Sequence, residues 1–548
     1  MKLWKVIVVL VVLVAINVLA QIVVCRWDMT DDKRYSISAP TKALLQELDA
    51  PLEVSILLDG DLNPGFKRLK KATYEMVEEL GVYSGGNWKI KRLSNETIGL
   101  LEEELKEQLL PIVIHERTHK GQTAQTTVYP YAVMDYIGQT IVIPLLKNQP
   151  GLSGEENLNH SIENLEYAIM EGIRTLVQDT VERIAFLEGH GELDEYDVYD
   201  ITRALARYYQ VDRGALGIET GVLDGYKAVI IADPQTDFSE VDKYIIDQYV
   251  MQGGRVLWLL NGVQFSKDYL SSQGTTPIVG LDLKLNDMLF RYGVRINHTL
   301  VQDLQCLPIP VDVSQDASVP NWQPMPWTYA PLLLTSQTSP ITRNVAQVKA
   351  TMASAVDIVG GNDGIRKEIL LATSSASKLT SAPAQVDLSF GHTQDEAFSY
   401  SFVPVAVSLE GVFPSVFAHQ LPPEGLQLHS SLRKQSQATK QIVVAAGSII
   451  RNDWKKNEPL PLGYDRYTQM QFGNRDFIVN SVLYLTDDQG WMQLRKKEFT
   501  LRLINDQRAR EMRITAQVIS IVIPLVILVL TGGIMIGIRR KKYTLQAL

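Results

Sequence analysis

Two stretches decide the fold class: residues 181–211 read VERIAFLEGHGELDEYDVYDITRALARYYQV, and residues 226–261 read YKAVIIADPQTDFSEVDKYIIDQYVMQGGRVLWLLN. Within them lie three short apolar runs, Ile184–Leu187, Ala228–Ile231 and Val256–Leu260. Short apolar runs that end at Glu188-Gly189, Ala232-Asp233-Pro234 and Asn261-Gly262 predict buried β-strands.

Helical sequence separates these strands. An Asp- and Tyr-rich segment continues as helix to Tyr209, and a second helix covers Glu240–Gln252 and stops at Gly253-Gly254. Strands that alternate with helices form a parallel sheet with right-handed crossovers. The predicted fold class is therefore α/β, with a central parallel-sheet domain.

The loops that follow the three strands are Glu188–Glu192, Asp233–Asp237 and Asn261-Gly262. In parallel sheets such loops form the binding edge. Their carboxylates and histidine suit ligand binding or acid–base work. The alternative is that Gly189 and Gly191 only permit a tight turn and the polar side chains cap a helix. The candidate ligand- or partner-binding residues at this edge are Glu188, His190, Glu192, Asp233 and Asn261.

Several kinds of chemistry find no support in the sequence. The two cysteines, Cys25 and Cys306, are not at strand ends of this domain, so a thiol nucleophile is not available there. No P-loop motif and no dinucleotide-binding glycine motif occur. The net charge of −9 gives no footprint for nucleic acid. We therefore expect no catalytic residue, no cofactor, no metal and no nucleic-acid partner.

One segment imitates a zinc protease motif. His115-Glu116-Arg117-Thr118-His119 is a literal H-E-x-x-H, which on a helix places two histidines on one face for zinc. The β-branched sequence around it favours a strand and a meander of antiparallel strands over Pro111–Leu146. In a strand the two histidines lie roughly 13 Å apart, too far for one metal ion.

Two apolar runs are long enough to cross a bilayer: Val6–Cys25 and Ile514–Ile538. Lysines precede the first run and Arg539-Arg540-Lys541-Lys542 follows the second, which places both termini in the cytoplasm. A cleaved signal peptide is the alternative for the first run. Because that run continues past the candidate cleavage site to Val24, an uncleaved anchor is favoured, with residues 26–513 outside the cytoplasm.

The remaining patterns give a domain plan. Ser153-Gly154-Glu155-Glu156 predicts a capping box that starts a helix reaching Leu176. Strand-like runs occur at 368–372, 401–409 and 441–446, and a helix at 477–485. The predicted parts are a membrane helix (1–25), a small α/β domain with a β-meander (26–150), a connecting helix (151–180), the central α/β domain (181–300), its extension with a β-rich insertion (301–500), a juxtamembrane helix (501–513), a membrane helix (514–538) and a basic cytoplasmic tail (539–548).

Parts of the sequence resemble a known family. FLEGHGE and VIIADP…QGGRVLWLLN are similar to auxiliary components of ABC transporters, whose domain is shared with intraflagellar transport proteins and related to amidotransferase folds. The segments KRYSISAPTKALLQEL, YPYAVMDYIGQTIVIPLLKNQPG, VAVSLEGVFPS, LGYDRYTQMQFGNRDFIVNSVLYLTDD and LRKKEFTLRLIN resemble the substrate-binding-like G component of the gliding-motility ABC transporter. Ala446-Gly447-Ser448 departs from the acidic pattern expected around that glycine.

The resemblance implies an amidotransferase-like or Rossmann-like central domain in a bacterial inner-membrane protein. It also implies a permease subunit and a separate ATPase subunit as partners, beside membrane lipid and a periplasmic ligand or protein. The leading hypothesis is a non-enzymatic auxiliary subunit linked to gliding. The alternatives are a membrane-tethered hydrolase that uses zinc or carboxylates, and a purely structural envelope scaffold.

Overall fold

The computed structural model describes residues 37–60, 62–92, 109, 111–117, 123–147, 152–177, 181–312, 314, 321–361, 364–388, 397–428, 431–456, 458–496 and 513–544. Residues 1–497 and 498–548 form two compact units. The predicted first span, Val6–Cys25, and residues 501–512 of the predicted juxtamembrane helix lie outside the described residues.

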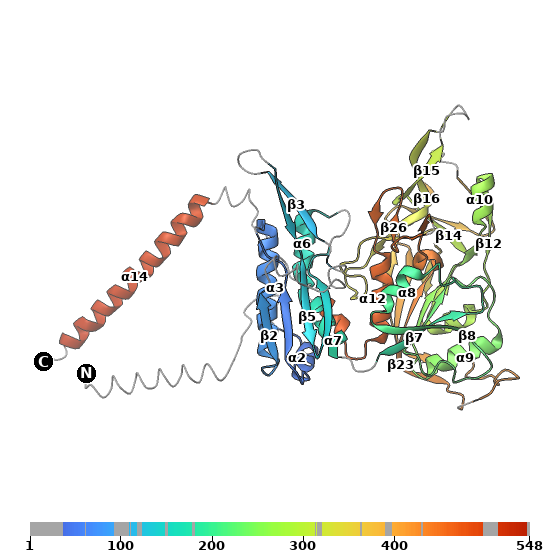
Figure 1. The fold of residues 1–548 in the computed structure, drawn as a ribbon, viewed down its shortest axis with the longest axis horizontal. Coiled ribbons are helices and arrows are strands. Elements are labelled where there is room, and N and C mark those ends of the chain that lie inside the picture. Colours follow the sequence, from blue (N-terminus) through green and yellow to red (C-terminus); the bar gives the residue numbers. More distant parts are fainter. Residues whose placement is uncertain are drawn as a thin grey trace. The chain divides into compact units, whose positions relative to one another are not determined.

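A small α/β region opens the first unit (Figure 1). Its sheet has the strand order β2-β1-β5-β6, in which β1 pairs with β2 in parallel and with β5 antiparallel. Apolar side chains of the helices and the sheet form one buried cluster. The elements are α2 (Ala39–Gln46), β1 (Leu52–Ile56), α3 (Pro64–Val82), β2 (Trp88–Arg92), β5 (Tyr131–Tyr136) and β6 (Gln139–Pro144).

The predicted meander is instead two separate hairpins. Among the residues that the structure describes, β3 (Ile112–Arg117) and β4 (Thr123–Val128) pair with each other alone, whereas β5 and β6 join the small sheet. Pro130 lies between the hairpins and has no N–H to continue a ladder. His115 and Glu116 lie in β3, which confirms a strand and excludes the helix that a zinc protease motif requires; His119 lies outside the described residues.

The predicted connecting helix is divided in two. α6 (Gly154–Glu163) begins with the expected capping box at Ser153, and α7 (Leu165–Val177) follows it. The break is at Asn164, whose N–H is shared between the carbonyl oxygens of His160 and Ser161 at 3.1 and 3.2 Å. The second of these bonds tightens the turn, and the apolar face of α7 then packs on the small sheet.

The larger sheet has the strand order β15-β16-β19-β22-β23-β10-β9-β7-β8 (Figure 1). Strands from β23 to β8 pair in parallel, and those from β15 to β23 pair antiparallel. Their bounds are β7 (Glu182–Glu188), β8 (Tyr209–Ala215), β9 (Ala228–Ala232), β10 (Val256–Leu259), β15 (Cys306–Asp312), β16 (Trp322–Thr335), β19 (Ile365–Ala372), β22 (Pro404–Pro414) and β23 (Gln435–Val444).

Burial on both faces explains the continuous apolar runs. Ala228, Ile230 and Ala232 of β9 enter one core cluster, while Val229 and Ile231 enter the cluster on the opposite face. The first cluster includes residues of α8 (Tyr199–Leu205) and α12 (Asn474–Thr486), and the second includes residues of α9 (Glu240–Met251) and α11 (Asn286–Tyr292).

One prediction in this region is wrong. The helix expected to reach Tyr209 ends at Leu205, and Tyr209 begins β8. The Tyr209 hydroxyl lies 2.6 Å from Thr486 Oγ1, and the ring is buried, so tertiary packing decides the local structure. The strand-like runs at 368–372, 401–409 and 441–446 overlap β19, β22 and β23, which extend the sheet.

Shorter elements complete the first unit: β11 (Val263–Gln264), α10 (Lys267–Gln273), β12 (Thr275–Gly280), β13 (Val294–Ile296), β14 (Thr299–Asp303), β17 (Val348–Lys349), β18 (Val356–Ile358), β20 (Ser377–Ser381), β21 (Ala384–Asp387), η2 (Gly447–Ile450), β24 (Trp454–Lys455), β25 (Glu458–Pro459), β26 (Tyr464–Asp465), β27 (Met470–Gln471) and η3 (Trp491–Lys496). The molecule is thus a mixed α/β protein.

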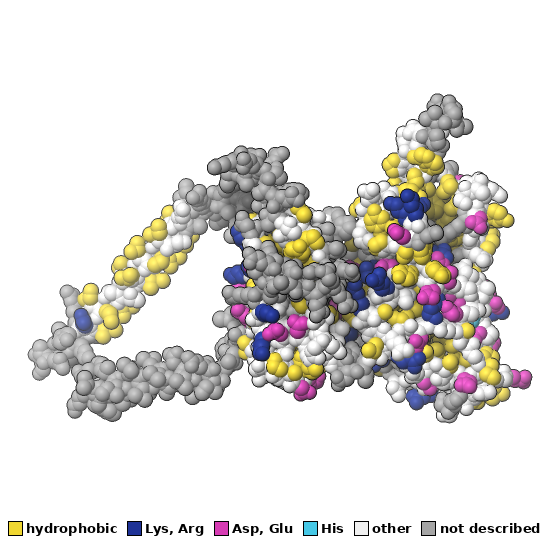
Figure 2. All heavy atoms as spheres, in the orientation of Figure 1, with side chains coloured by type: hydrophobic (Ala, Val, Ile, Leu, Met, Phe, Trp, Pro, Cys, Tyr) yellow, Lys and Arg dark blue, Asp and Glu magenta, His cyan; other side chains and the backbone are white. Residues whose placement is uncertain are grey.

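The second unit contains the helix α14 (Arg513–Thr544). Its segment Gln517–Arg539 has a mean hydropathy of 2.7 and is the candidate membrane span found among the described residues. Figure 2 shows hydrophobic side chains along most of this segment. An exposed apolar helix of this length agrees with the predicted second span.

Candidate functional site

A pocket of about 350 Å³ lies where β7, β9, β10 and β23 end. Each of these parallel strands is followed by a loop that contributes to the wall, which is the arrangement in which α/β sheets bind ligands. The volume is within the range of small-molecule sites. The lining residues are Gly191, Glu192, Leu193, Asp194, Asp197, Asp233, Gln235, Asn261, Val263, Gln264, Phe265, Ser448 and Arg451.

Asp233 contacts residues from the two neighbouring strand ends at this edge. It follows β9 in the left-handed conformation with φ +57°, which is uncommon for a residue other than glycine. Asn261 Nδ2 donates to Asp233 Oδ1 at 2.6 Å, and the Gly447 N–H donates to Asn261 Oδ1 at 2.8 Å. A Cβ at Gly447 would lie 2.5 Å from Asp233 Oδ1, so only glycine fits there. Three strand ends are thereby fixed against one another.

His190 lies behind the pocket wall instead of lining it. Its Nδ1 is 3.0 Å from Glu192 Oε1, its Nε2 is 3.3 Å from Asp242 Oδ2, and its ring stacks on Phe238. Burial lowers the pKa of His190, but the carboxylates of Glu192 and Asp242 outweigh burial and leave that pKa above its ordinary value. The His190 N–H also donates to Glu192 Oε2 at 2.6 Å. His190 therefore positions Glu192.

Glu188 does not line the pocket. Arg213 of β8 donates from Nε to Glu188 Oε1 at 2.7 Å and from Nη2 to the carbonyl oxygen of Leu193. The pair ties the end of β7 to the edge strand. Of the five residues proposed from the sequence, the structure brings Glu192, Asp233 and Asn261 to the pocket.

The sequence analysis missed the opposite wall, which includes Asp197, Ser448 and Arg451. Arg451 Nη2 donates to Asp197 Oδ2 at 2.7 Å, which joins the loop after β7 to the loop after β23. The available signal was the strand predicted at 441–446. Placed in parallel beside β10, that strand brings its following loop to the same edge.

The lining carries more acid than base. Four carboxylates (Glu192, Asp194, Asp197 and Asp233) against one guanidinium (Arg451) give a formal charge of −3. Such a lining favours a cationic ligand or one rich in hydrogen-bond donors over an anion. Within the described residues, no group of three or more His, Cys, Asp or Glu side chains is arranged to hold a metal ion.

The elbow at Asp233 is poorly suited to acyl transfer. A nucleophile at such a turn uses the N–H of the following residue to stabilise an oxyanion, and here that residue is Pro234, which has no N–H. The Asp233 carboxylate is also engaged by Asn261. The arrangement is better suited to binding than to nucleophilic catalysis.

A mixed α/β chain with a polar pocket at the carboxyl edge of its sheet and one candidate membrane helix is consistent with a membrane protein. The particular family is shown by sequence. The chain belongs to the ABC transporter auxiliary family, whose model, described as an ABC-type uncharacterized transport system, matches residues 182–481, more than half of the chain. A second model, a domain of unknown function (DUF7088), matches residues 31–135.

Other comparisons add little. No curated protein matches the chain. A solved structure titled "mmIFT52 N-terminal domain" is similar at 14% identity with a TM-score of 0.33, over 56% of this chain and 99% of that chain. A likeness at this level carries no argument about function.

Proposed function

We propose that this protein is a non-catalytic auxiliary subunit of a bacterial ABC transporter linked to gliding motility. It assembles in the inner membrane with a permease subunit and a separate ATPase subunit. Residues 26–513 face the periplasm and both termini are cytoplasmic, with membrane helices at 1–25 and 514–538. The observation that carries the proposal is the family match over 182–481.

Two further observations support it. Gln517–Arg539 is apolar enough to cross a membrane, and Arg539-Arg540-Lys541-Lys542 follows it in the sequence, as is typical of a cytoplasmic flank. The chain has no P-loop motif, so the ATPase activity of such a system must come from another subunit.

The pocket at the carboxyl edge is the proposed binding surface for a periplasmic ligand or partner. Its volume, its mixed polar lining and its place at the strand ends support this role. Pro234 beside Asp233 and the engagement of that carboxylate by Asn261 disfavour the hydrolase alternative.

The test is purification of the full-length tagged protein in mild detergent from its own host. We expect a permease and an ATPase to copurify in fixed ratio. Isolation of the chain alone, under conditions that keep other inner-membrane complexes intact, would overturn the proposal. Deletion of the gene should abolish gliding, and the full-length chain should restore it.

The hydrolase alternative has its own test. The Glu192→Gln and Asp233→Asn variants should still bind the permease and the ATPase, the wild-type protein should show no hydrolytic activity that these variants lack, and the purified protein should contain no stoichiometric zinc. Zinc at one equivalent, or hydrolysis that disappears in these variants, would favour the alternative.

A further inference from the structure

The carboxyl-edge pocket offers hydrogen-bond acceptors that the protein itself does not use. Asp194 Oδ1 accepts from the Asp197 N–H at 2.8 Å, and Asp197 Oδ2 accepts from Arg451 Nη2 at 2.7 Å. The other oxygens of these two carboxylates have no hydrogen-bond donor among the residues that the structure describes. Gln235 Nε2 donates to the carbonyl oxygen of Asp233 at 2.8 Å, so its Oε1 remains an acceptor. A ligand that fits this lining must therefore supply donors.

The negative charge of the lining favours a donor that is also a cation. Arg451, the cationic side chain in the lining, is already paired with Asp197, and the formal charge of the lining is −3. A proton on His190, which lies behind the wall against Glu192, would raise this charge by one and still leave −2. A cationic ligand would neutralise part of the charge and form charge-assisted hydrogen bonds, which are stronger than neutral ones.

The pocket also has an apolar wall, formed by Leu193, Val263 and Phe265. Leu193 belongs to the core of the larger sheet, and Val263 to a separate buried cluster against which Phe265 packs. Both cores hold these side chains in place, so the wall is preformed. An inorganic cation would leave the wall facing water, whereas an alkyl chain would cover it. The volume of about 350 Å³ accommodates an organic ion of this kind.

We propose that the pocket binds an alkyl guanidinium or alkyl ammonium group, whose charge lies at Asp194 and Asp197 and whose alkyl chain lies along the apolar wall. The inference rests on the proposed function, in which this pocket binds a periplasmic ligand or partner. Free organic cations and the arginine or lysine side chains of a protein both present this group, so the two sources share one chemistry.

The first test is isothermal titration calorimetry on the full-length protein in detergent, with a titration into detergent alone as the blank. Butylguanidinium carries both the charge and the chain, butylurea keeps the shape without the charge, and methylguanidinium keeps the charge without the chain. Butylguanidinium should bind with a Kd of about 1 mM or tighter, and each of the other two at least about fivefold more weakly. Equal binding of butylurea, or no binding of butylguanidinium up to about 10 mM, would overturn the proposal.

A pair of variants at Gln264 separates electrostatic attraction from a general disturbance of the pocket. Gln264 is an exposed residue of the lining, so both changes are tolerated by the fold. Gln264→Glu adds a carboxylate and should tighten the binding of butylguanidinium about threefold, whereas Gln264→Lys adds a cation and should weaken it about threefold. Weaker binding in both variants, or no change in either, would overturn the proposal.

Asp194→Asn tests the cation contact itself. The asparagine keeps an oxygen for the Asp197 N–H and removes the charge, so butylguanidinium should bind about fivefold more weakly. The matched control is Asp59→Asn in the small region, which removes one negative charge from a carboxylate that is 46% exposed and paired with Lys70. This control should bind as the wild type does. An equal loss in the control would mean that net charge alone explains the effect, which also overturns the proposal.

The copurified complex distinguishes the two sources of the group. A free ligand leaves the pocket open, so butylguanidinium should bind the isolated chain and the complex alike. A partner's arginine or lysine side chain in the pocket should block binding to the complex alone. If no complex with a permease and an ATPase assembles while the isolated chain binds butylguanidinium, the proposed function fails and the ligand class stands. If the complex assembles and butylguanidinium binds neither form, the ligand class fails while the proposed function stands.

Discussion

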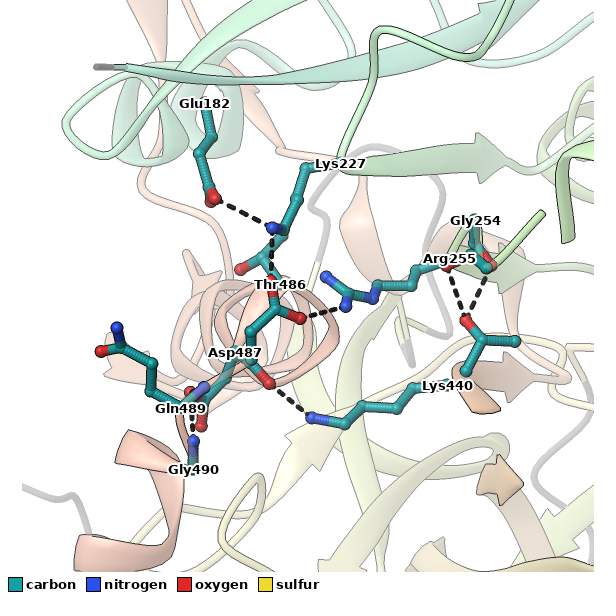
Figure 3. Close-up of polar contacts among 12 residues, drawn as sticks. Glu182, Lys227, Gly254, Arg255, Lys440, Thr486, Asp487, Gln489 and Gly490 are labelled. Carbon is teal, nitrogen blue, oxygen red and sulfur yellow. Dashed lines mark hydrogen bonds and ion pairs between the residues drawn. The ribbon is translucent and has the colours of Figure 1, made fainter. Parts of the chain in front are cut away.

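The two edges of the same parallel sheet are built on opposite plans. At the carboxyl edge the strands end in Asp233, Asn261 and a glycine-containing loop, and the side chains bond to one another around a hollow of about 350 Å³. At the amino edge Lys227 and Arg255 immediately precede β9 and β10, and both form ion pairs with Asp488, which follows α12 (Figure 3). The carboxyl edge thus carries an open pocket, whereas the amino edge is occupied by the chain itself.

Charge follows the same division. The carboxyl-edge pocket has a formal charge of −3, whereas the amino edge presents cationic side chains that are matched by Glu182 and Asp488. Carboxylates in an open pocket destabilise the fold little, because water can solvate them. Partly buried cationic side chains such as Lys227 and Arg255 are stable only beside a carboxylate, which Asp488 supplies.

The largest expected loss of stability comes from a substitution that disrupts the packing at the carboxyl edge. Gly447→Ala places a methyl group 2.5 Å from Asp233 Oδ1, and the bonded neighbours of that carboxylate leave it little room to move. We expect a loss of about 2 kcal/mol in the free energy of unfolding, measured by urea denaturation of the full-length protein in detergent. Gly360→Ala is the control, because nothing lies within 4 Å of a Cβ there. Equal stability of the two variants would refute the close packing described at this edge.

A smaller effect is expected at the amino edge. Asp488→Ala leaves Arg255 without its carboxylate, and we expect a loss of about 1 kcal/mol, since half of Asp488 is exposed. A double variant that also carries Arg255→Leu should be no less stable than Asp488→Ala, because it removes the charge left without a partner. Additive losses from the two substitutions would mean that the pair is not coupled.

Sequence patterns predicted the strands of the carboxyl edge because both faces of that sheet are buried. The runs at 184–187, 228–231 and 256–260 lie in or overlap β7, β9 and β10, and their following loops supply Glu192, Asp233 and Asn261 to the pocket. Parallel strands bring the loops that follow them to one edge of the sheet. The position of these three residues can therefore be predicted from local sequence patterns alone.

The rest of the site depends on contacts that no local pattern specifies. Arg451 reaches the pocket because β23 pairs with β10, a neighbour about 185 residues away in the chain, as the Gly254–Thr439 bond illustrates. Tyr209 begins a strand instead of ending a helix, and it pairs with Glu182 in the sheet and bonds to Thr486, contacts that the local sequence does not reveal. The ion pairs of Asp488 are not predictable from the sequence, since two adjacent acidic residues after a helix resemble any exposed carboxylates.

A pH-dependent effect is expected at His190. The carboxylates of Glu192 and Asp242 outweigh burial and raise the pKa of His190, so protonated His190 stabilises the folded state. This stabilisation is fully present below the unfolded value, about 6.5, and is lost as the pH rises through the folded value. His190→Gln should therefore flatten the decrease in stability above that pH. His419→Gln, at an exposed histidine, should keep the wild-type pH profile. A wild-type profile in His190→Gln would contradict this role.

The smallest effect is expected at Glu188, the residue of the predicted edge that does not reach the pocket. Glu188→Gln weakens one ion pair with Arg213 in which the Glu188 side chain is 45% exposed, so stability should change by less than about 0.5 kcal/mol. Arg213 Nη2 still donates to the carbonyl oxygen of Leu193, which holds the loop after β7 in place. Gliding and the copurification of partners should then match the wild type, whereas Asp233→Asn, inside the pocket, should impair any function that depends on a bound ligand. If Glu188→Gln impaired function as much as Asp233→Asn, the functional surface would be the β7–β8 edge of the sheet and not the pocket.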